Sequence, residues 1–318
     1  MDLSEFQETT DAIRIEVSEV VQGQEPLIDM LLTSIFARGH CLLEGPPGTA
    51  KTLLARCLSR VISLDFGRVQ FTPDLMPGDV LGVNLYDFKS GEFRLTQGPV
   101  FTDILLADEI NRAPPKTQSA LLQAMNEREV TIDGSSYPLG AEFFVVATQN
   151  PIEQHGTYPL PEAQLDRFLF KLMVDFPDRE TEVSILSRSA SLPVETDKGR
   201  TELREVLTRD ALQAGRKLVD GIRLDETILT YIVDLIRATR ADAEILHGAS
   251  TRAADALAAA VRARAALDGR DYGLPDDVQA LITPVLRHRI VLGPTAEIEG
   301  RTSDDVLATI VNRLDAPR

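Results

Sequence analysis

Residues Glu44–Thr52 read E-G-P-P-G-T-A-K-T, and they directly follow the short apolar run Cys41-Leu42-Leu43. Such a run predicts a buried strand, and the stretch after it comes close to the pattern G-x-x-x-x-G-K-[ST] of phosphate-binding loops. One residue departs from the strict pattern, because Ala50 stands where the second glycine is expected. The sequence therefore predicts a strand, a loop that surrounds phosphate groups, and a helix that begins where the loop ends.

The residue types of this loop suit the binding of a nucleotide. Gly45 and Gly48 let the backbone turn its N–H groups inward around phosphate oxygens. Lys51 would place a positive charge on the outer phosphates, and the hydroxyl of Thr52 suits Mg²⁺. The helix that follows would point its unpaired N–H groups and its dipole at the anion. The predicted nucleotide contacts here are Gly45, Pro46, Pro47, Gly48, Thr49, Ala50, Lys51, Thr52 and Leu53.

The composition is that of an ordinary globular protein. Of the 318 residues 43% are hydrophobic and 26% are charged, and the length allows one large domain or two of ordinary size. The N-terminus is acidic where a secretory signal would be basic and then apolar, and no stretch approaches about 18 uncharged apolar residues. We therefore expect a cytoplasmic protein that does not insert into a membrane.

The net charge of −16 is concentrated in the first part of the chain. Residues 1–178 hold 13 Lys and Arg against 26 Asp and Glu, whereas residues 179–318 hold 20 against 23. Proteins that grip a nucleic-acid backbone usually carry a basic patch or domain. The charge balance therefore argues against a nucleic-acid partner, although a small basic surface could lie within it.

A second strand brings two carboxylates to the predicted site. The apolar run Phe101–Ala107 ends in Asp108 and Glu109, and ligands of open α/β sheets bind at the carboxyl ends of strands. Asp108 can hold the magnesium shell, and Glu109 can accept a proton from an attacking water. An Asp-Glu pair after a strand is often only a solvated strand end, but its position after a phosphate loop favours the catalytic interpretation.

Three further polar residues stand at positions that suggest roles. Asn150 follows the buried run Glu142–Thr148, where its amide could position a water or simply form a turn before a proline. Gln24 ends the loop 20–24, which could lie against a bound base or could be a plain connection between two helices. Arg252 stands in the first turn of a helix, where its charge opposes the helix dipole, and the alternative is an ordinary surface arginine.

Two hairpins and a change of periodicity complete the organisation of the chain. Alternating runs predict hairpins at about 84–95 and about 130–140, the second around Asp133-Gly134. After residue 178 helical periodicity dominates, as in the predicted helices Thr251–Leu267 and Pro275–Leu286, and strand signals disappear. We therefore expect an α/β core over residues 1–178 and a small all-α domain over residues 179–318.

Arg167 stands on a predicted short helix before a last strand. In this order, the phosphate loop, the Asp-Glu pair, the strand-end asparagine, Arg167 and Arg252 resemble an AAA+ ATPase, and more closely the MoxR family. The resemblance covers nearly the whole chain. It is carried by V-V-Q-G-Q-E (20–25), G-H-C-L-L-E-G-P-P-G-T-A-K-T (39–52), L-L-A-D-E-I-N-R-A-P-P-K-T-Q-S-A-L-L-Q-A-M (105–125), A-T-Q-N-P (147–151), G-T-Y-P-L-P-E-A-Q-L-D-R-F (156–168) and L-R-H-R (286–289).

The resemblance implies a parallel five-stranded sheet of order 5-1-4-3-2, a helical lid, and a homo-oligomeric ring, commonly a hexamer. It also implies that the hairpin at 84–95 is a helix-2 insert and that the one at 130–140 is a presensor hairpin, both facing the pore or a partner. Carried over by position, Lys51 and Thr52 match Walker A, Asp108 and Glu109 match Walker B, Asn150 matches sensor 1, Arg167 the arginine finger and Arg252 sensor 2. Ser250-Thr251-Arg252 departs from the Ser-Pro-Arg that is frequent in the family, and proline is favoured at a first helical position.

The function implied is Mg²⁺-dependent ATP hydrolysis coupled to remodelling of a partner protein. Only the resemblance, and nothing in the composition, implies chaperone-like maturation or metal-cofactor insertion, with a von Willebrand factor A domain protein as partner. A nucleic-acid motor subunit is the alternative, and the acidic core weighs against it. A nucleotide-gated scaffold without hydrolysis is a third hypothesis, and the presence of Glu109 argues against it.

Overall fold

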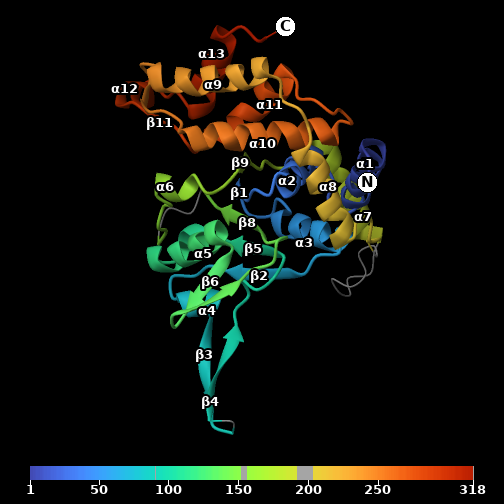
Figure 1. The fold of residues 1–318 in the computed structure, drawn as a ribbon, viewed down its shortest axis with the longest axis vertical. Coiled ribbons are helices and arrows are strands. Elements are labelled where there is room, and N and C mark those ends of the chain that lie inside the picture. The colour runs from blue at the N-terminus through green and yellow to red at the C-terminus, as the bar shows by residue number, and fades with distance from the viewer. Residues whose placement is uncertain (90, 152–155, 192–202, 318) are drawn as a thin grey trace.

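A five-stranded parallel sheet forms the centre of the computed structural model, which describes residues 1–89, 91–151, 156–191 and 203–317 (Figure 1). The strands lie in the order β2-β5-β8-β1-β9, and every neighbouring pair is parallel. Numbered 1 to 5 along the chain and read from β9, this order is 5-1-4-3-2, the expected one. The strands are β1 Cys41–Glu44, β2 Phe66–Gln70, β5 Ile104–Asp108, β8 Phe144–Gln149 and β9 Phe170–Met173.

Alternate residues of the central strands face two separate cores, because successive side chains of a strand point to opposite faces. Leu106 and Val146 belong to the core that includes the first three helices, whereas Leu105 and Val145 belong to the core on the other face. The first core includes α1 Leu3–Ser18, α2 Glu25–Phe36 and α3 Lys51–Val61 together with helices of the C-terminal part, and the second includes α4 Pro77–Leu81 and α5 Pro115–Glu127. Two short turns, η1 Ile110–Arg112 and α6 Glu162–Leu165, follow β5 and precede β9.

Both expected hairpins are present. The first pairs β3 Gly82–Asp87 with β4 Glu92–Gln97 and extends away from the body of the molecule (Figure 1). The second pairs β6 Glu129–Ile132 with β7 Ser135–Pro138. The amide of Asn84 donates to Asp133 at 2.9 Å, so the root of the first hairpin touches the turn of the second. Ser90 in the tip of the first hairpin lies outside the described residues.

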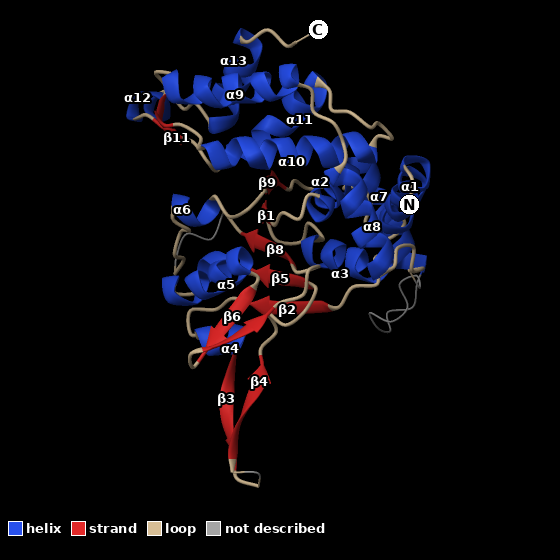
Figure 2. Ribbon diagram, in the orientation of Figure 1, coloured by secondary structure: helices blue, strands red, loops and turns tan. Residues whose placement is uncertain are grey.

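The C-terminal part is helical, as expected, apart from one short ribbon in which β10 Ile245–His247 pairs antiparallel with β11 Val291–Leu292 (Figure 2). Strands of three and two residues are too short to show a period, and their pairing joins distant parts of the sequence. The helices are α7 Arg179–Ser191, α8 Arg209–Asp220, α9 Glu226–Ala241, α10 Thr251–Leu267, α11 Pro275–Leu286, α12 Pro294–Ile298 and α13 Ser303–Arg313.

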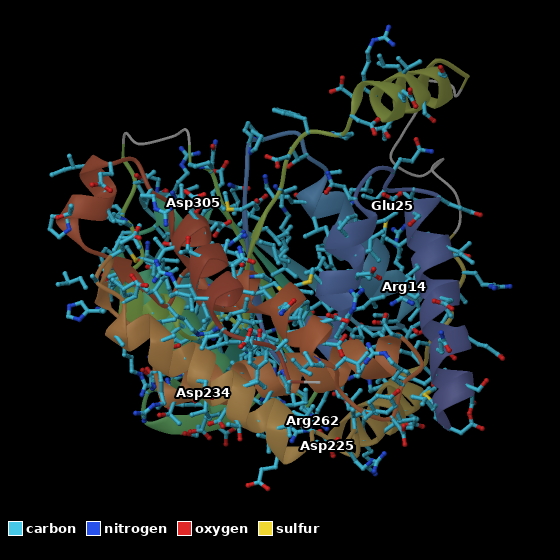
Figure 3. All side chains as sticks on the ribbon, turned by 90° about the horizontal axis from the view of Figure 1, so that it is seen from above. Arg14, Glu25, Asp225, Asp234, Arg262 and Asp305 are labelled. Carbon is cyan, nitrogen blue, oxygen red and sulfur yellow. The ribbon has the colours of Figure 1, made fainter. Side chains whose placement is uncertain are left out.

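Helices on the C-terminal side of residue 178 differ in how they meet the core. Arg216 of α8 donates to the carbonyls of Ile35 and Ala141, both at 3.0 Å, so α8 is fastened to the core. The helix α7 instead stands away from the body of the molecule (Figure 3) and exposes Val183 and Leu186. Among the described residues no helix is long and apolar enough to cross a membrane. The division at residue 178 stays a proposal.

Candidate active site

The phosphate-binding loop joins the end of β1 to the start of α3, and two of its glycines are needed for different reasons. A Cβ at Gly45 would lie 2.1 Å from the carbonyl oxygen of Val174, so only glycine allows the chain after β9 to pass so close. Gly48 has open space around it but a φ of +86°, which favours glycine for conformational reasons. Ala50 also has a left-handed backbone, with φ of +59°. The departure from the motif thus falls at a position that glycine would occupy without strain.

Lys51 directs its ammonium group back over the loop. Its Nζ donates to the carbonyls of Gly45 at 2.9 Å and Pro46 at 2.7 Å and to the hydroxyl of Thr49 at 3.1 Å. Burial lowers the pKa of Lys51, and the charges of Asp108 and Glu109 oppose this effect. The cation therefore lies at the loop with its three donors directed at oxygen acceptors, which is the chemistry that phosphate oxygens would also satisfy.

Asp108 lies at the carboxyl end of β5, where two neighbours fix both of its oxygens. Thr148 of β8 donates its hydroxyl to Oδ1 at 2.6 Å, and Arg68 of β2 donates to Oδ2 at 2.8 Å. These partners come from the two strands that flank β5 in the sheet. The carboxylate is thereby held in one orientation in front of the phosphate loop.

Glu109 stands just beyond the strand in a left-handed conformation, with φ of +56°. Its backbone N–H donates to the hydroxyl of Thr148 at 2.8 Å. Its Oε2 accepts from Gln70 at 2.8 Å and from Arg112 at 2.9 Å. Non-glycine residues in this conformation are uncommon and concentrate at functional sites. The unusual backbone turns the side chain of Glu109 away from the direction that a continuing strand would give it.

These residues line one cavity of about 430 Å³ at the carboxyl edge of the sheet. The structure brings together the loop, both carboxylates and Asn150, as expected from the sequence. The cavity is lined by Gly45, Pro47, Gly48, Thr49, Ala50, Lys51, Thr52, Leu53, Asp108, Glu109, Thr148, Gln149 and Asn150. Pro46 is not among the lining residues, and its carbonyl instead binds Lys51.

Gln24 lies beside this cavity and lines a second one of about 340 Å³ together with Leu27, Met30 and Phe176. Its side-chain amide donates to the carbonyl of Asp175 at 3.1 Å. Since Asp175 follows Val174, which abuts Gly45, the two cavities lie at the same edge of the sheet. This apolar cavity next to the phosphate loop is a suitable place for the base of a nucleotide.

The two predicted arginines do not reach the phosphate loop within the chain. Arg167 and Arg252 line a third cavity together with His40 and Leu169, which precede β1 and β9. It therefore lies at the amino edge of the sheet, whereas the phosphate loop follows the carboxyl end of β1. With about 3.3 Å per strand residue, the four residues of β1 put the two edges roughly 13 Å apart.

Arg167 and Arg252 have different polar partners in the structure. Arg167 donates to the carbonyl of Leu122 and, within the described part of the chain, forms no ion pair with the neighbouring Asp166 or with Glu162, the partners that a structural arginine would most simply have. Asp166 instead pairs with Arg289 at 2.7 Å and with Arg252 at 3.4 Å.

Sequence reasoning missed several residues of the site. Arg68, Gln70, Arg112 and Thr148 hold the two carboxylates, and Arg289 holds Asp166. Thr148 offered one signal, because it lies two residues before Asn150 at the end of a strand expected beside the Asp108 strand. Arg112 lies only three residues after Glu109, but its pairing depends on the left-handed turn there, and the contacts of Arg68, Gln70 and Arg289 join residues far apart in the sequence, where local patterns give no sign of the partner.

The donor set at the loop fits Mg²⁺. Thr52 supplies a hydroxyl and Asp108 a carboxylate in the same cavity, and hard oxygen donors of this kind suit this ion, which keeps several waters and binds substrate phosphates. The fixed orientation of Asp108 by Thr148 and Arg68 supports the same use, since outer partners commonly orient metal ligands.

Several known proteins resemble this chain in sequence and in fold. The model of the ATPase family associated with various cellular activities (AAA) matches residues 40–170, and that of the AAA lid domain matches residues 237–310. The uncharacterized protein YeaC of Bacillus subtilis is 44% identical over 95% of this chain and 92% of its own length. The crystal structure of a protein assigned as an ATPase from Cytophaga hutchinsonii has a TM-score of 0.91 at 39% identity, covering 99% of this chain and 97% of that one.

Another relative indicates the family within the AAA+ ATPases. The chaperone MoxR1 of Mycobacterium tuberculosis is 39% identical over 98% of this chain and 83% of its own length. Both family models fall on the parts of the chain that carry the phosphate loop and the helical lid. With the cavity that joins the loop to the two carboxylates, these likenesses show that the chain belongs to the MoxR family of AAA+ ATPases.

Proposed function

We propose that this ATPase works as a ring of copies, six by likeness to the family, in which each ATP site is completed by the neighbouring subunit. The observation that carries the proposal is the separation of the site's parts. Lys51 and Glu109 lie at the carboxyl edge of the sheet, and Arg167 and Arg252 lie at the amino edge. An arginine at one edge cannot serve the phosphates at the other edge of its own chain, but it can serve those of a neighbour.

Within one subunit the residues have separable roles. Lys51 and the loop N–H groups hold the phosphates, Thr52 and Asp108 would hold Mg²⁺, and the apolar cavity beside Gln24 takes the base. When bound, the ion neutralises charge on the outer phosphates. Glu109 accepts the proton of the attacking water, and Asn150 orients that water.

The need for an arginine follows from charge. The phosphoryl group in transfer spreads negative charge over its oxygens, and Lys51 with the ion leaves part of this charge uncompensated. The amino-edge cavity is rich in cations that could compensate it. Asp220 pairs with Arg38, and the other arginines that line the cavity outnumber its two carboxylates, Asp166 and Asp255: they are Arg128, Arg167, Arg252 and Arg289. This excess of positive charge supports a role opposite a neighbour's nucleotide.

Hydrolysis would drive the remodelling of a partner protein, and the β3–β4 hairpin is the surface we assign to that partner. Phe88 at its tip is 90% exposed, and the ring of Tyr86 meets those of Phe88 and Phe93 edge to face, each at 5.2 Å. The charges of the hairpin cancel, Asp87 and Glu92 against Lys89 and Arg94. An aromatic surface without net positive charge suits an apolar polypeptide better than a phosphate backbone, so it favours a protein partner over nucleic acid.

Partner maturation, metal-cofactor insertion and a von Willebrand factor A domain partner remain part of this proposal through the family likeness. An ATP-bound Glu109→Gln variant should retain such a partner, because ATP stays bound without being hydrolysed. Recovery of the bound protein and its identification by mass spectrometry would test this assignment.

The neighbour-completed site is tested by mixing two inactive variants. Arg167→Ala should bind ATP normally but lose roughly 10³-fold or more in turnover, the scale of a missing arginine finger. Glu109→Gln should lose at least about 10²-fold through loss of the general base. In mixed rings some interfaces pair an intact Glu109 with a neighbour's intact Arg167, so ATPase activity should return. If subunits exchange and no activity returns at any ratio, Arg167 does not act across the interface.

A further inference from the structure

A buried contact joins the helical lid to the segment that carries Arg167. The side chain of Arg289, three residues beyond the end of α11, is only 4% exposed. Its Nε donates to Oδ1 of Asp166 at 2.7 Å. Its Nη2 donates to the carbonyls of Phe168 at 2.7 Å and Asp166 at 3.2 Å, and its Nη1 donates to that of Leu169 at 3.1 Å. One guanidinium group therefore binds the residues on both sides of Arg167.

Two neighbouring contacts also help to hold the Asp166–Leu169 segment. The Nε2–H of His288 donates a hydrogen bond to the carbonyl of Phe168 at 2.9 Å. Two consecutive lid residues, His288 and Arg289, therefore bind the same carbonyl. The other carboxylate oxygen of Asp166 lies 3.4 Å from Arg252. Arg289 thus sets the orientation of the carboxylate that Arg252 meets, and it fixes the backbone from which Arg167 extends.

The geometry of these contacts requires an arginine. Planar N–H donors reach several acceptors in fixed directions, whereas a lysine has a single nitrogen on a flexible stem. Buried carbonyls that lose their donors would draw in water or shift, and the chain around Arg167 would move with them. A displacement of about 1 Å in a positioning group can lower a rate by about 10²-fold.

We infer that Arg289 is a positioning residue for ATP hydrolysis, which holds the Asp166–Leu169 segment so that Arg167 meets the nucleotide of the neighbouring subunit. The inference rests on the proposed neighbour-completed site. It makes the lid of one subunit a determinant of turnover in the next, although Arg289 touches no nucleotide itself. A purely structural link would instead affect the folding and assembly of its own subunit.

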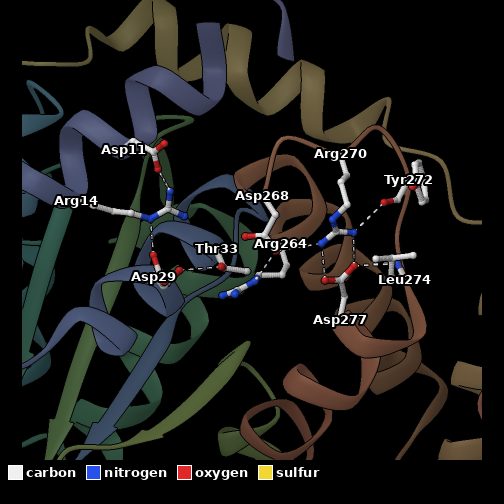
Figure 4. A network of polar contacts seen from close by, with 10 residues as sticks. All are labelled: Asp11, Arg14, Asp29, Thr33, Arg264, Asp268, Arg270, Tyr272, Leu274 and Asp277. Atoms are coloured by element: carbon white, nitrogen blue, oxygen red, sulfur yellow. Dashed lines mark hydrogen bonds and ion pairs between the residues drawn. The ribbon is translucent and has the colours of Figure 1, made fainter. Parts of the chain in front are cut away.

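A matched control lies at the other end of the same helix. Arg270 is also a largely buried arginine, and it donates twice to Asp277 at 2.7 Å, to Asp268 at 3.0 Å and to the carbonyl of Tyr272 at 3.2 Å (Figure 4). These contacts hold the start of α11 and lie away from the Arg167 segment. Arg270→Lys therefore reports what a weakened lid contact does by itself.

The first measurement compares steady-state kinetics of the two variants. We expect Arg289→Lys to lower turnover at saturating ATP by roughly 10-fold to 10²-fold, because a displaced arginine fits the transition state poorly. The KM for ATP should stay within about twofold, since Arg167 compensates charge that develops in the transition state rather than charge on the bound ATP. Arg270→Lys should keep near wild-type turnover. Equal turnover in the two lysine variants would overturn the inference.

The second measurement asks on which subunit the defect acts. Arg289→Lys mixed with Glu109→Gln should regain activity, because some interfaces then pair an intact Glu109 with an unaltered Arg167 segment. Arg289→Lys mixed with Arg167→Ala should regain none, since both changes damage the same side of the interface. Recovery with Arg167→Ala but not with Glu109→Gln would place Arg289 at its own nucleotide and overturn the inference.

The reference mixture of Arg167→Ala with Glu109→Gln separates the two ideas. If it fails to recover activity, the neighbour-completed site is wrong, whereas if it succeeds and the Arg289→Lys mixture fails, only the role of Arg289 is wrong. Should Arg289→Lys not fold or assemble, Asp166→Asn serves instead, because it removes one carboxylate and leaves the carbonyl acceptors in place. It should show the same recovery with Glu109→Gln, and normal turnover of this variant would contradict the inference.

Discussion

Lys51 shows how one residue can hold the shape of the phosphate-binding loop and also offer its donors to a ligand. Its donors are directed at Gly45, Pro46 and Thr49, so the loop keeps its shape around a cation. A phosphate oxygen that enters would compete for the same donors, and a charge-assisted hydrogen bond to an anion is stronger than one to a neutral carbonyl. We therefore expect the ammonium group to turn from the loop toward the phosphates on binding.

Ala50 gives a prediction at the same scale. Its φ of +59° lies in the left-handed region, which costs a non-glycine residue about 1–2 kcal/mol, whereas glycine adopts it freely. Glycine also has more freedom in the unfolded chain, which costs roughly 0.5–1 kcal/mol. We therefore expect Ala50→Gly to leave the free energy of unfolding unchanged or to raise it by up to about 1.5 kcal/mol, as measured by urea denaturation.

The control for this change is a half-buried alanine with ordinary helical geometry. Ala120 lies in the middle of α5, where a glycine should lower the free energy of unfolding by about 1 kcal/mol. If Ala50→Gly destabilises the protein as much as Ala120→Gly does, the left-handed backbone at position 50 is not strained.

The residues of the site could be predicted from sequence where their positions follow local rules. Lys51, Asp108, Glu109 and Asn150 stand in a motif or at a strand end, and the structure brings them together in one cavity. Arg289 could not be assigned a role, because its partners at Asp166–Leu169 lie about 120 positions away in the chain. Local sequence patterns predict which residue faces a ligand. They do not predict which distant residue holds that side chain in position.

Among the secondary-structure elements, hydrophobic periodicity predicted the long, regular helices but not the shortest strands. The helices α10 and α11 span the residues expected of them, Thr251–Leu267 and Pro275–Leu286, because their apolar stripes extend over several turns. The ribbon of β10 and β11 was not expected, since strands of three and two residues show no alternation. Their pairing is set by the packing of the lid rather than by their own sequence.

The β3–β4 hairpin carries the second prediction. Because Phe88 is almost fully exposed, its removal should change the free energy of unfolding by less than about 0.5 kcal/mol. We expect Phe88→Ala to keep basal ATPase activity but to lose stimulation by the partner recovered with ATP-bound Glu109→Gln. The measurement compares turnover with and without that partner.

Tyr272 offers the control for this prediction, since it is an exposed aromatic residue of the lid far from the hairpin. Tyr272→Ala should keep both basal and stimulated turnover. Unfolding of Phe88→Ala, or a stimulation equal to that of the control, would contradict the role of the hairpin.

The whole molecule is acidic, yet its cations are gathered where the proposed assembly needs them. The net charge is −16, but the amino-edge cavity is lined by five arginines and two carboxylates. The phosphate cavity lies at the opposite edge, so head-to-tail contact of two copies would bring a cationic surface to a bound polyphosphate. Such a heterologous contact closes into a ring when the rotation between neighbours is a whole fraction of a full turn, and it otherwise continues as an open filament. The exposed apolar residues of α7, Val183 and Leu186, offer further surface that a neighbour could cover.

The last prediction follows from this arrangement and concerns protein concentration. If every active site needs two chains, a dissociated subunit can bind ATP but cannot hydrolyse it at the full rate. Turnover per subunit should therefore rise with protein concentration and level off where sedimentation shows assembly to be complete, since association follows mass action. Arg167→Ala should assemble over the same concentrations and stay slow throughout, which separates assembly from catalysis. A turnover per subunit that stays constant while sedimentation shows monomers joining into larger species would mean that each chain hydrolyses ATP alone, and the arginines at the amino edge would then need another explanation.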